Sequence, residues 1–380
     1  MAAPARKAIV LSGGGARGAY EAGVLSTALE AAGGARVELL CGTSVGGIHA
    51  AIVASHADAL PRAAEVLRQA WLGLEVETAL SLWSWHPGRI QRVIRGGTRP
   101  ASIFDGRPLA RLVGRVVDWP GVARNLGSGA LRALAVTATH VPTGRPTVFV
   151  DTSAGQAPPR FSSLRARVQP TRIAAPHLLA SAAIPLLFPA VRVEGELHCD
   201  GGLRMNTPLA PALGMGADRV LVIAQSTARP AAVDAGTESY PGAAFLLGKV
   251  LNAFLLDHVV NDLEELQIVN RLLGAASAAG GANLLEKLAA GHDGAPGFRH
   301  VEPFVIRPSD DIGALAHRHL HRLSCRPPTT ALLRVAESGW GGVADLASYL
   351  LFDRAFTTDL FELGRADAEA QRETIAAFFA

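Results

Sequence analysis

The segment Gly42-Thr43-Ser44-Val45-Gly46 is a G-x-S-x-G sequence that follows an apolar strand pattern and precedes a helical pattern. This order is typical of a nucleophile elbow, in which a sharp turn between strand and helix holds a serine hydroxyl clear of the fold. Gly42 and Gly46 leave room for the turn, and the first amides of the helix favour negative charge on the serine oxygen. The spacing therefore predicts Ser44 as the nucleophile of an acyl-transfer reaction.

A second motif, Gly13-Gly14-Gly15-Ala16-Arg17-Gly18, follows the apolar run Lys7 to Ser12, which is predicted to be a short buried strand. Backbone amides without a Cβ in the way can surround the oxygen that becomes negative in a tetrahedral intermediate. Because this strand should lie beside the elbow strand, we expect the loop to form an oxyanion hole next to Ser44, with Arg17 steadying it or adding positive charge. The candidate oxyanion residues are Gly13, Gly14, Gly15, Arg17 and Gly18.

The base that takes the serine proton is harder to assign. Asp200-Gly201-Gly202 closes a predicted hairpin strand, so its carboxylate should project from the same sheet edge as the elbow, and the glycines permit close approach. The alternative is an ordinary Asp-Gly turn. His49 follows Ser44 by five positions, roughly 140° around a helix, so we expect it to face elsewhere.

The first 60 residues alternate strand and helix patterns, which indicates a parallel sheet covered by helices. We expect a catalytic core over residues 5–225, with a helical insertion at about 61–128, and a mainly helical part over 226–380 packed on the same domain. The predicted strands are 7–12, 37–41, 131–140, 147–150, 188–193, 197–200, 219–225 and 301–306. The main predicted helices are 19–32, 45–59, 171–183, 243–273, 283–290 and 329–379, the last with a break at 339–342.

Composition excludes several classes of protein. The 380 residues are 49% hydrophobic with a net charge of +3, and no basic cluster interleaved with aromatic residues suggests nucleic acid. The three cysteines have no metal-ligand spacing, and two of them, Cys41 and Cys199, are expected to be small buried residues at strand ends. No apolar run reaches the roughly 18 residues of a membrane span. We expect a cytoplasmic protein, with room for peripheral contact at a membrane surface.

These motifs, together with Ser181-Ala182-Ala183-Ile184-Pro185, resemble the patatin-like phospholipases in type, order and spacing over about residues 7–225. The resemblance implies a three-layer α/β/α fold with a mainly parallel central sheet. It also implies Ser44 as nucleophile, Asp200 as its only catalytic partner, and the glycine-rich loop as oxyanion hole. The glycines expected to support the elbow and the aspartate motif are Gly42, Gly46, Gly201 and Gly202.

The activity implied by the resemblance is that of a serine lipid acyl hydrolase of the phospholipase A or lysophospholipase type, acting on a phospholipid or another acyl-ester lipid without metal or cofactor. Transfer of the acyl group to a lipid instead of water stays open, as does a noncatalytic lipid-binding protein of this fold. The segment Ser348 to Asp353 is similar to the tail of bacterial members.

Two other interpretations compete. The glycine loop also fits a dinucleotide-binding turn, but its acidic residue should close the second strand, whereas Glu38 opens that strand. A Ser-His-Asp triad would need a histidine after Asp200 as base. The candidates for that base are His258, His292, His300, His317, His319 and His321.

Overall fold

The computed structural model describes residues 5–73, 102, 104–153, 166–227, 258–290, 297–322 and 345–380. Several predicted features lie wholly or partly outside these residues. They are positions 74–101 and 103 of the helical insertion, 243–257 of the helix expected at 243–273, 329–344 of the helix expected at 329–379 with its break, Cys325 and the candidate base His292.

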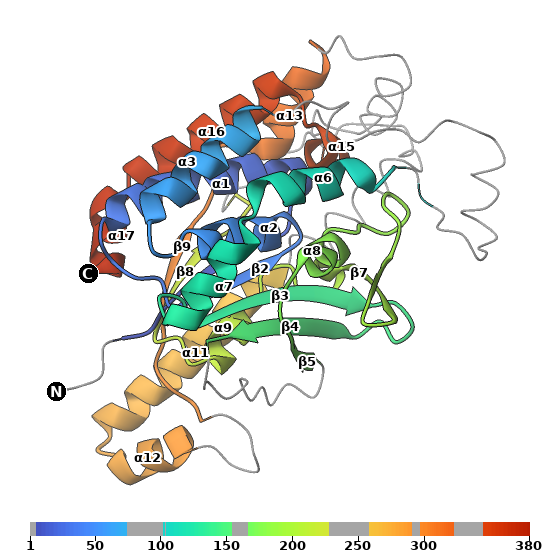
Figure 1. Ribbon diagram of the computed structural model, residues 1–380. Helices are drawn as coiled ribbons and strands as arrows, with labels where there is room; N and C mark the ends of the chain where they lie inside the picture. Colours follow the sequence, from blue (N-terminus) through green and yellow to red (C-terminus); the bar gives the residue numbers. More distant parts are fainter. Residues whose placement is uncertain are drawn as a thin grey trace, which may run out of the picture.

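A nine-stranded sheet forms the centre of the molecule, in the order β5-β4-β3-β2-β1-β8-β9, with β7 paired to β3 and β6 paired to β7 (Figure 1). The strands are β1 (Lys7–Leu11), β2 (Leu39–Thr43), β3 (Ala133–His140), β4 (Pro146–Thr152), β5 (Arg167–Pro170), β6 (Val191–Val193), β7 (Glu196–Asp200), β8 (Arg219–Ile223) and β9 (Glu302–Ile306). The β1, β2, β3, β8 and β9 ladder is parallel, as is β4 with β5, whereas the pairs β3–β4, β3–β7 and β6–β7 are antiparallel. The predicted mainly parallel sheet is confirmed.

Strand register brings the motifs together at one end of the strands, the carboxyl ends of β1 and β2. Leu11 at the end of β1 pairs with Gly42 of β2, and Thr43 pairs with Thr137 of β3. Because the strands are parallel, the glycine loop and the elbow leave the sheet side by side. β7 runs antiparallel to β3 with Ala138 opposite Asp200, so its last residue reaches the same end.

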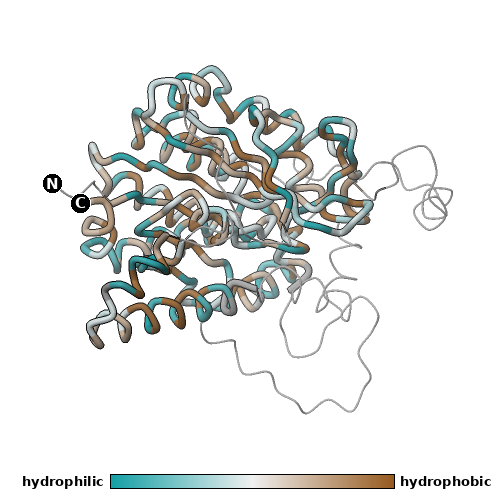
Figure 2. The backbone as a smooth tube through the Cα atoms, turned by 90° about the horizontal axis from the view of Figure 1, so that it is seen from below, coloured by the Kyte–Doolittle hydropathy of each residue, from teal (hydrophilic) through white to brown (hydrophobic). Residues whose placement is uncertain are grey.

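Helices cover both faces, because alternate side chains of the buried strands point to opposite sides. Ile9 and Leu11 belong to the core beneath one helical layer, whereas Ala8 and Val10 belong to a second core on the other side. Figure 2 shows hydrophobic residues running along the central strands. The first layer contains α1 (Gly18–Ala32), α2 (Val45–Ser55), α3 (Leu60–Leu72), α6 (Arg107–Val116), α7 (Trp119–Ser128), α8 (Ala175–Ser181), α13 (Ile312–Leu320), α15 (Asp345–Leu350), α16 (Arg354–Glu369) and α17 (Arg372–Phe379).

The second core is covered by α9 (Leu209–Gly214) and α11 (His258–Ala278), and α12 (Ala282–Ala290) follows α11 (Figure 1). β9, which comes from the C-terminal part of the chain, completes the edge of the sheet beside β8. α16 packs along α1, so the C-terminal helices form part of the same layer as the N-terminal ones.

Some element boundaries differ from the prediction. α2 ends at Ser55 instead of Ala59, and α8 begins at Ala175, just before a proline at its first turn. The hairpin of β6 and β7 turns at Glu194 and Gly195, and Asp200 is the last residue of β7. β5 and α13 were not predicted. In the part of the chain that the structure describes, no helix is both long and apolar enough to cross a membrane.

Candidate active site

Ser44 occupies a strained turn between β2 and α2, with φ 54° and ψ −124°. A Cβ on Gly42 would lie 2.2 Å from the carbonyl oxygen of Gly46, and a Cβ on Gly46 would lie 2.5 Å from that of Leu11. Both contacts are far closer than any real Cβ allows. The two glycines therefore let this turn close against itself and against β1.

The hydroxyl of Ser44 donates a hydrogen bond of 2.7 Å from Oγ to Oδ2 of Asp200. The other carboxylate oxygen accepts the amide of Gly202 at 2.7 Å, and the amide of Asp200 itself donates to the carbonyl of Ala183 at 2.9 Å. A Cβ on Gly201 would lie 2.4 Å from the carbonyl oxygen of Thr137. The glycine after the aspartate thus lets this turn lie directly against β3. This close packing places the Asp200 carboxylate next to Ser44.

Burial changes the basicity of Asp200. Its exposed fraction is 1%, and this burial raises the pKa of the carboxyl group to about 7, although hydrogen bonds from Ser44 and Gly202 act in the opposite direction. A carboxylate with an ordinary pKa is a weak base at neutral pH. Desolvation brings Asp200 close to the pKa that general-base catalysis requires at neutral pH.

The glycine-rich loop divides its amides into two groups. The amides of Gly13, Arg17 and Gly18 already donate within the protein: Gly13 to the carbonyl of Asn206 at 3.1 Å, Arg17 to that of Gly14 at 3.1 Å, and Gly18 to carbonyls of the preceding turn. Within the described part of the chain, the amides of Gly14, Gly15 and Ala16 have no such acceptor. These three are the amides of the loop that remain able to bind an outside oxygen.

Arg17 is buried and directed into the protein. Its Nε donates to Oγ of Ser348 at 2.7 Å, and the guanidinium lies 4.6 Å from the centre of the Tyr349 ring. Gly15 has φ 56°, and a Cβ there would lie 2.4 Å from the carbonyl oxygen of Tyr349. Arg17 thus fastens the loop to α15, a contact between residues more than 300 positions apart that no local sequence signal indicates.

The segment Ser181-Ala182-Ala183-Ile184-Pro185 supports both catalytic candidates. Oγ of Ser181 accepts the amide of Ser44 at 2.7 Å and donates to the carbonyl of Thr137 at 2.6 Å. Ala183 accepts the amide of Asp200, and Ile184 lines the adjacent cavity. The sequence marked this segment only through the family resemblance, and its role in holding the elbow was not predicted.

An apolar cavity opens beside Ser44, with about 920 Å³ of atom-free space including its open mouth. Ser44 and Gly15 are part of its lining, so the serine and the glycine-rich loop border the same space. The walls come mainly from α2, α6 and the loop after α8, and include Ile48, Ile52, Leu109, Leu112, Ile184 and Phe188.

His49 also lines this cavity, but it is held by two partners. Its Nδ1 lies 2.8 Å from Oε1 of Glu21, and its Nε2 accepts the indole N–H of Trp71 at 2.8 Å. Nδ1 therefore carries the proton that is shared with Glu21. Glu21 also accepts the amide of Ser12 at 2.7 Å, and burial raises the pKa of this carboxyl group. We expected His49 to face away from Ser44. Both of its ring nitrogens bond to Glu21 and Trp71, and neither bonds to the serine.

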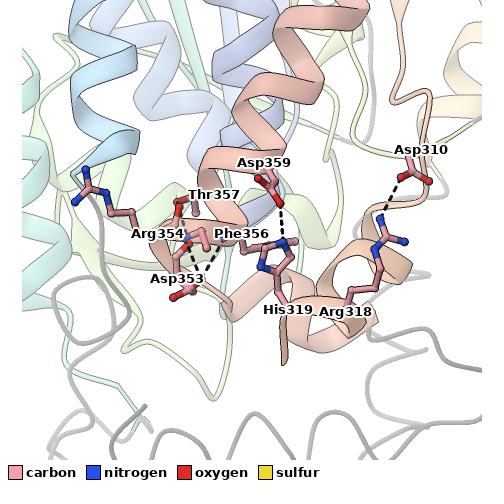
Figure 3. A network of polar contacts seen from close by, with 9 residues as sticks. Asp310, Arg318, His319, Asp353, Arg354, Phe356, Thr357 and Asp359 are labelled. Carbon is pink, nitrogen blue, oxygen red and sulfur yellow. Dashed lines mark hydrogen bonds and ion pairs between the residues drawn. The ribbon is translucent and has the colours of Figure 1, made fainter. Parts of the chain in front are cut away.

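Three of the other candidate bases, His317, His319 and His321, have partners other than Ser44 and Asp200, and His300 is exposed. Nε2 of His319 lies 2.8 Å from Oδ2 of Asp359, between α13 and α16 (Figure 3). His317 and His321 face each other, with their Nε2 atoms 3.3 Å apart. A Ser-His-Asp triad requires a histidine between the serine and the aspartate. Here Ser44 and Asp200 are in direct contact, so no histidine lies between them.

The described residues contain no group of three or more His, Cys, Asp or Glu side chains placed to hold a metal ion. Cys41 and Cys199 are free thiols, buried as expected, and burial raises the pKa of Cys199 to about 11.

The chain was also compared with known proteins. A comparison with curated protein sequences finds no match. Among solved structures, the chain is similar to VipD from Legionella pneumophila, at 14% identity and a TM-score of 0.35, over 95% of this chain and 67% of that one. It is also similar to human GIVD cytosolic phospholipase A2 in complex with methyl gamma-linolenyl fluorophosphonate, at 14% identity and a TM-score of 0.42. That match covers 99% of this chain and 58% of the human chain.

A model of the family described as "Patatin-like phospholipase" matches residues 9–213, more than half of the chain, and this range includes every motif of the candidate site. The chain therefore belongs to the patatin-like phospholipases, a family of carboxylic ester hydrolases.

Proposed function

We propose that this protein hydrolyses acyl esters of lipids with Ser44 as nucleophile and Asp200 as general base. The observation that carries the proposal is the 2.7 Å hydrogen bond between the two side chains at the wall of an apolar cavity. A nucleophile must be within hydrogen-bond reach of its base, and an apolar cavity suits the acyl chain of a lipid.

In the first half of the reaction, Oγ of Ser44 forms a bond to the ester carbonyl carbon while Asp200 accepts the hydroxyl proton. The carbonyl oxygen becomes negative, and we infer that unbonded amides of the glycine loop, those of Gly14, Gly15 and Ala16, donate to it. Collapse of the tetrahedral intermediate breaks the ester C–O bond, and Asp200 returns the proton to the leaving alcohol. The products of this half are the free alcohol and an acyl-Ser44 ester.

In the second half, Asp200 takes a proton from water as the water oxygen attacks the acyl-serine. The intermediate collapses with loss of Oγ of Ser44, which recovers its proton from Asp200, and the fatty acid is released. Each donor amide of an oxyanion hole contributes about 100- to 1,000-fold to such reactions. The loop therefore has a rate effect comparable to that of the base.

The proposal predicts a rising pH profile. Asp200 acts as a base only when it is ionised, and its pKa is raised to about 7. The rate should increase with pH through the neutral range, in contrast to a carboxylate of ordinary pKa, which would be fully ionised well below pH 6.

The test compares Ser44→Ala and Asp200→Asn with the unaltered protein on a chromogenic fatty-acyl ester and in labelling by a fluorophosphonate probe. Ser44→Ala should lose both hydrolysis and labelling, and Asp200→Asn should lose hydrolysis. Ser26→Ala is the matched control, because its buried hydroxyl donates to a carbonyl within α1 and not to the site. An unaltered protein that is neither labelled nor active would favour the noncatalytic alternative.

A further inference from the structure

Helix α6 separates charge from apolar surface with unusual clarity. Arg107, Arg111 and Arg115 recur at four-residue intervals, which places them along one exposed side of the helix. The other side carries Leu109 and Leu112, which line the cavity that contains Ser44. α6 is therefore an amphipathic helix that forms part of the cavity wall while presenting arginines to the surface.

Most of this positive charge is not neutralised by the protein. Arg107 is paired with Asp105, 2.5 Å from Nε to Oδ2. Arg111 and Arg115 have no carboxylate within ion-pair distance among the residues that the structure describes, and α6 itself contains no acidic residue. Arg115 also lines the cavity, so one of the two uncompensated charges lies where the cavity meets the surface.

An exposed leucine lies on the loop beside this helix. Leu186 is 54% exposed and has φ 68°, a left-handed conformation that is costly for a residue with a side chain of this size. Its neighbours Ile184 and Phe188 line the cavity. A strained, exposed apolar side chain is a candidate for function, because stability alone would favour glycine or asparagine at this position.

The leucine loop and α6 are physically joined. The carbonyl of Leu187 accepts the amide of Phe104 at 2.8 Å, and a Cβ on Gly106 would lie 3.7 Å from the ring of Pro189. α6 also packs on α8, the helix that precedes the loop. The loop that carries Leu186 is thus attached to α6 and the segment before it, and Arg111, Arg115 and Leu186 are together called the cavity rim below.

We propose that the cavity rim docks on a bilayer that contains anionic phospholipid, with Arg111 and Arg115 at the headgroups, Leu186 in the apolar boundary beneath them and the cavity mouth facing the lipid. The inference deepens the proposed function, on which it rests for the identity of the cavity as an acyl-chain site. Arginines beside apolar side chains match the order of charges and acyl chains in such a surface. A nucleic acid would satisfy the arginines but would offer nothing to Leu186 or to the apolar cavity.

The size of the effect follows from the number of charges. Each arginine near an anionic membrane surface contributes about fivefold to partitioning, so the two free charges predict about 25-fold tighter binding to anionic than to neutral vesicles. Salt should weaken this preference, because the interaction is screened within about 10 Å at 0.1 M ionic strength.

The test is vesicle co-sedimentation of the whole 380-residue chain in a Ser44→Ala background, so that no lipid is hydrolysed during the measurement. Vesicles of phosphatidylcholine alone are compared with vesicles that also contain phosphatidylglycerol. Arg111→Glu/Arg115→Glu should abolish the preference for the anionic vesicles. Leu186→Asn, which suits the left-handed backbone, should weaken binding to both kinds of vesicle.

The matched control is Arg36→Glu/Arg271→Glu, which makes the same change in net charge at exposed positions. Arg36 precedes β2, and Arg271 lies on α11 next to a residue that binds the start of β9, so both lie toward the opposite edge of the sheet from Ser44. The control should retain the preference for anionic vesicles.

Equal loss in the control and rim variants would overturn the proposal, since net charge alone would then explain binding. So would unchanged binding of the rim variant, or equal binding of the Ser44→Ala protein to both vesicle types. Binding to a nucleic acid or a protein partner in place of anionic vesicles would also contradict it. Hydrolysis of a soluble ester by the protein with intact Ser44 is measured separately, so the docking proposal and the proposed chemistry can fail independently.

Discussion

Two histidine–carboxylate pairs of this molecule have the same length and very different surroundings. His49 and Glu21 lie 2.8 Å apart, with side chains 2% and 0% exposed, next to the cavity. His319 and Asp359 also lie 2.8 Å apart, but their side chains are 10% and 57% exposed, on the outer helices α13 and α16 (Figure 3). The distance is equal in the two pairs, so the distance does not decide what each pair contributes.

The surroundings decide it. Around Glu21, the carboxylate is out of contact with water and must satisfy the amide of Ser12 as well as His49. Removing one partner from such a pair leaves a buried charge or donor without compensation. Asp359 is largely exposed, so water can replace His319 as its partner at little cost.

The Ser44–Asp200 pair belongs with the buried region. Here desolvation has a chemical effect, because it raises the pKa of Asp200 into the neutral range. The comparison teaches that burial next to the cavity fixes the positions of polar groups and shifts the pKa of their carboxyls. On the outer α13–α16 surface, water can replace a lost polar partner. Four predictions test this difference.

The largest effect is expected for Asp200→Asn. Loss of the general base should lower the rate of ester hydrolysis by about 100- to 10,000-fold. In the folded protein the pKa of the Asp200 carboxyl is raised from 3.8 to about 7, so the folded state favours the protonated form. The stability that protonated Asp200 gives to the folded state is fully present below pH 3.8 and is lost as the pH rises through 7. The variant should therefore be more stable than the unaltered protein at pH 8, by at most about 4 kcal/mol, and nearly equal to it at pH 4.

Thermal unfolding at the two pH values, with a hydrolysis assay, checks this prediction. Asp310→Asn is the control, since Asp310 is exposed and faces Arg318 on the outer surface. A variant that is no more stable at pH 8 than at pH 4, relative to the unaltered protein, would show that burial does not raise the pKa of Asp200.

The second prediction concerns Glu21→Ala. The change removes the acceptor of the His49 Nδ1 proton and of the Ser12 amide inside the core, so the free energy of unfolding should fall by about 3–5 kcal/mol. Glu21→Gln, which keeps an oxygen for the Ser12 amide, should be less destabilised. Denaturant titration measures both, and a loss below about 1 kcal/mol in Glu21→Ala would remove the distinction between the two regions.

The third prediction concerns Ser181→Ala. The amide of Ser44 would lose its buried acceptor, which should cost about 1–3 kcal/mol of stability and loosen the elbow. We expect kcat to fall while KM for a soluble ester changes little, because the cavity walls are unaffected. Ser26→Ala again serves as the control, and a change confined to KM would argue that Ser181 shapes the cavity instead of positioning the nucleophile.

The smallest effect is expected for Asp359→Asn. Because the carboxylate is more than half exposed, the loss of its pair with His319 should change the free energy of unfolding by less than about 1 kcal/mol, and less still at high salt. Denaturant titration at two salt concentrations checks this. A loss as large as that of Glu21→Ala would mean that burial is not what distinguishes the pairs.

Much of the fold could be predicted from the sequence, because it depends on local patterns of apolar and β-branched residues. The strand at Lys7–Leu11, the helix at Gly18–Ala32 and the hairpin of β3 and β4 appear where the apolar and β-branched residues predicted them. Boundaries were less accurate. β2 runs on to Thr43, beyond the predicted end at Cys41, because Gly42 and Thr43 still pair with β3 before the elbow turns.

The contacts that complete the site could not be predicted from the sequence in the same way. The sequence showed that Ser44 stands in an elbow and that glycines surround it, since a strained turn needs those residue types at fixed spacing. It gave no sign that Ser181 would accept the Ser44 amide, that Ser348 would hold Arg17, or that His49 would be taken up by Glu21. Each of these contacts joins residues that are neighbours only after the sheet and its two helical layers have assembled.

By itself, then, the sequence determined the residue types at the elbow, the glycine loop and the aspartate turn, because backbone strain and close approach permit few alternatives there. Tertiary structure alone decided that burial raises the pKa of Asp200 to about 7, and that some amides of the glycine loop find no acceptor among the described residues. It also decided that α6 turns one side to the cavity and its arginines outward. Burial and hydrogen-bond satisfaction depend on every element packed around a group, and spacing along the chain does not contain that information.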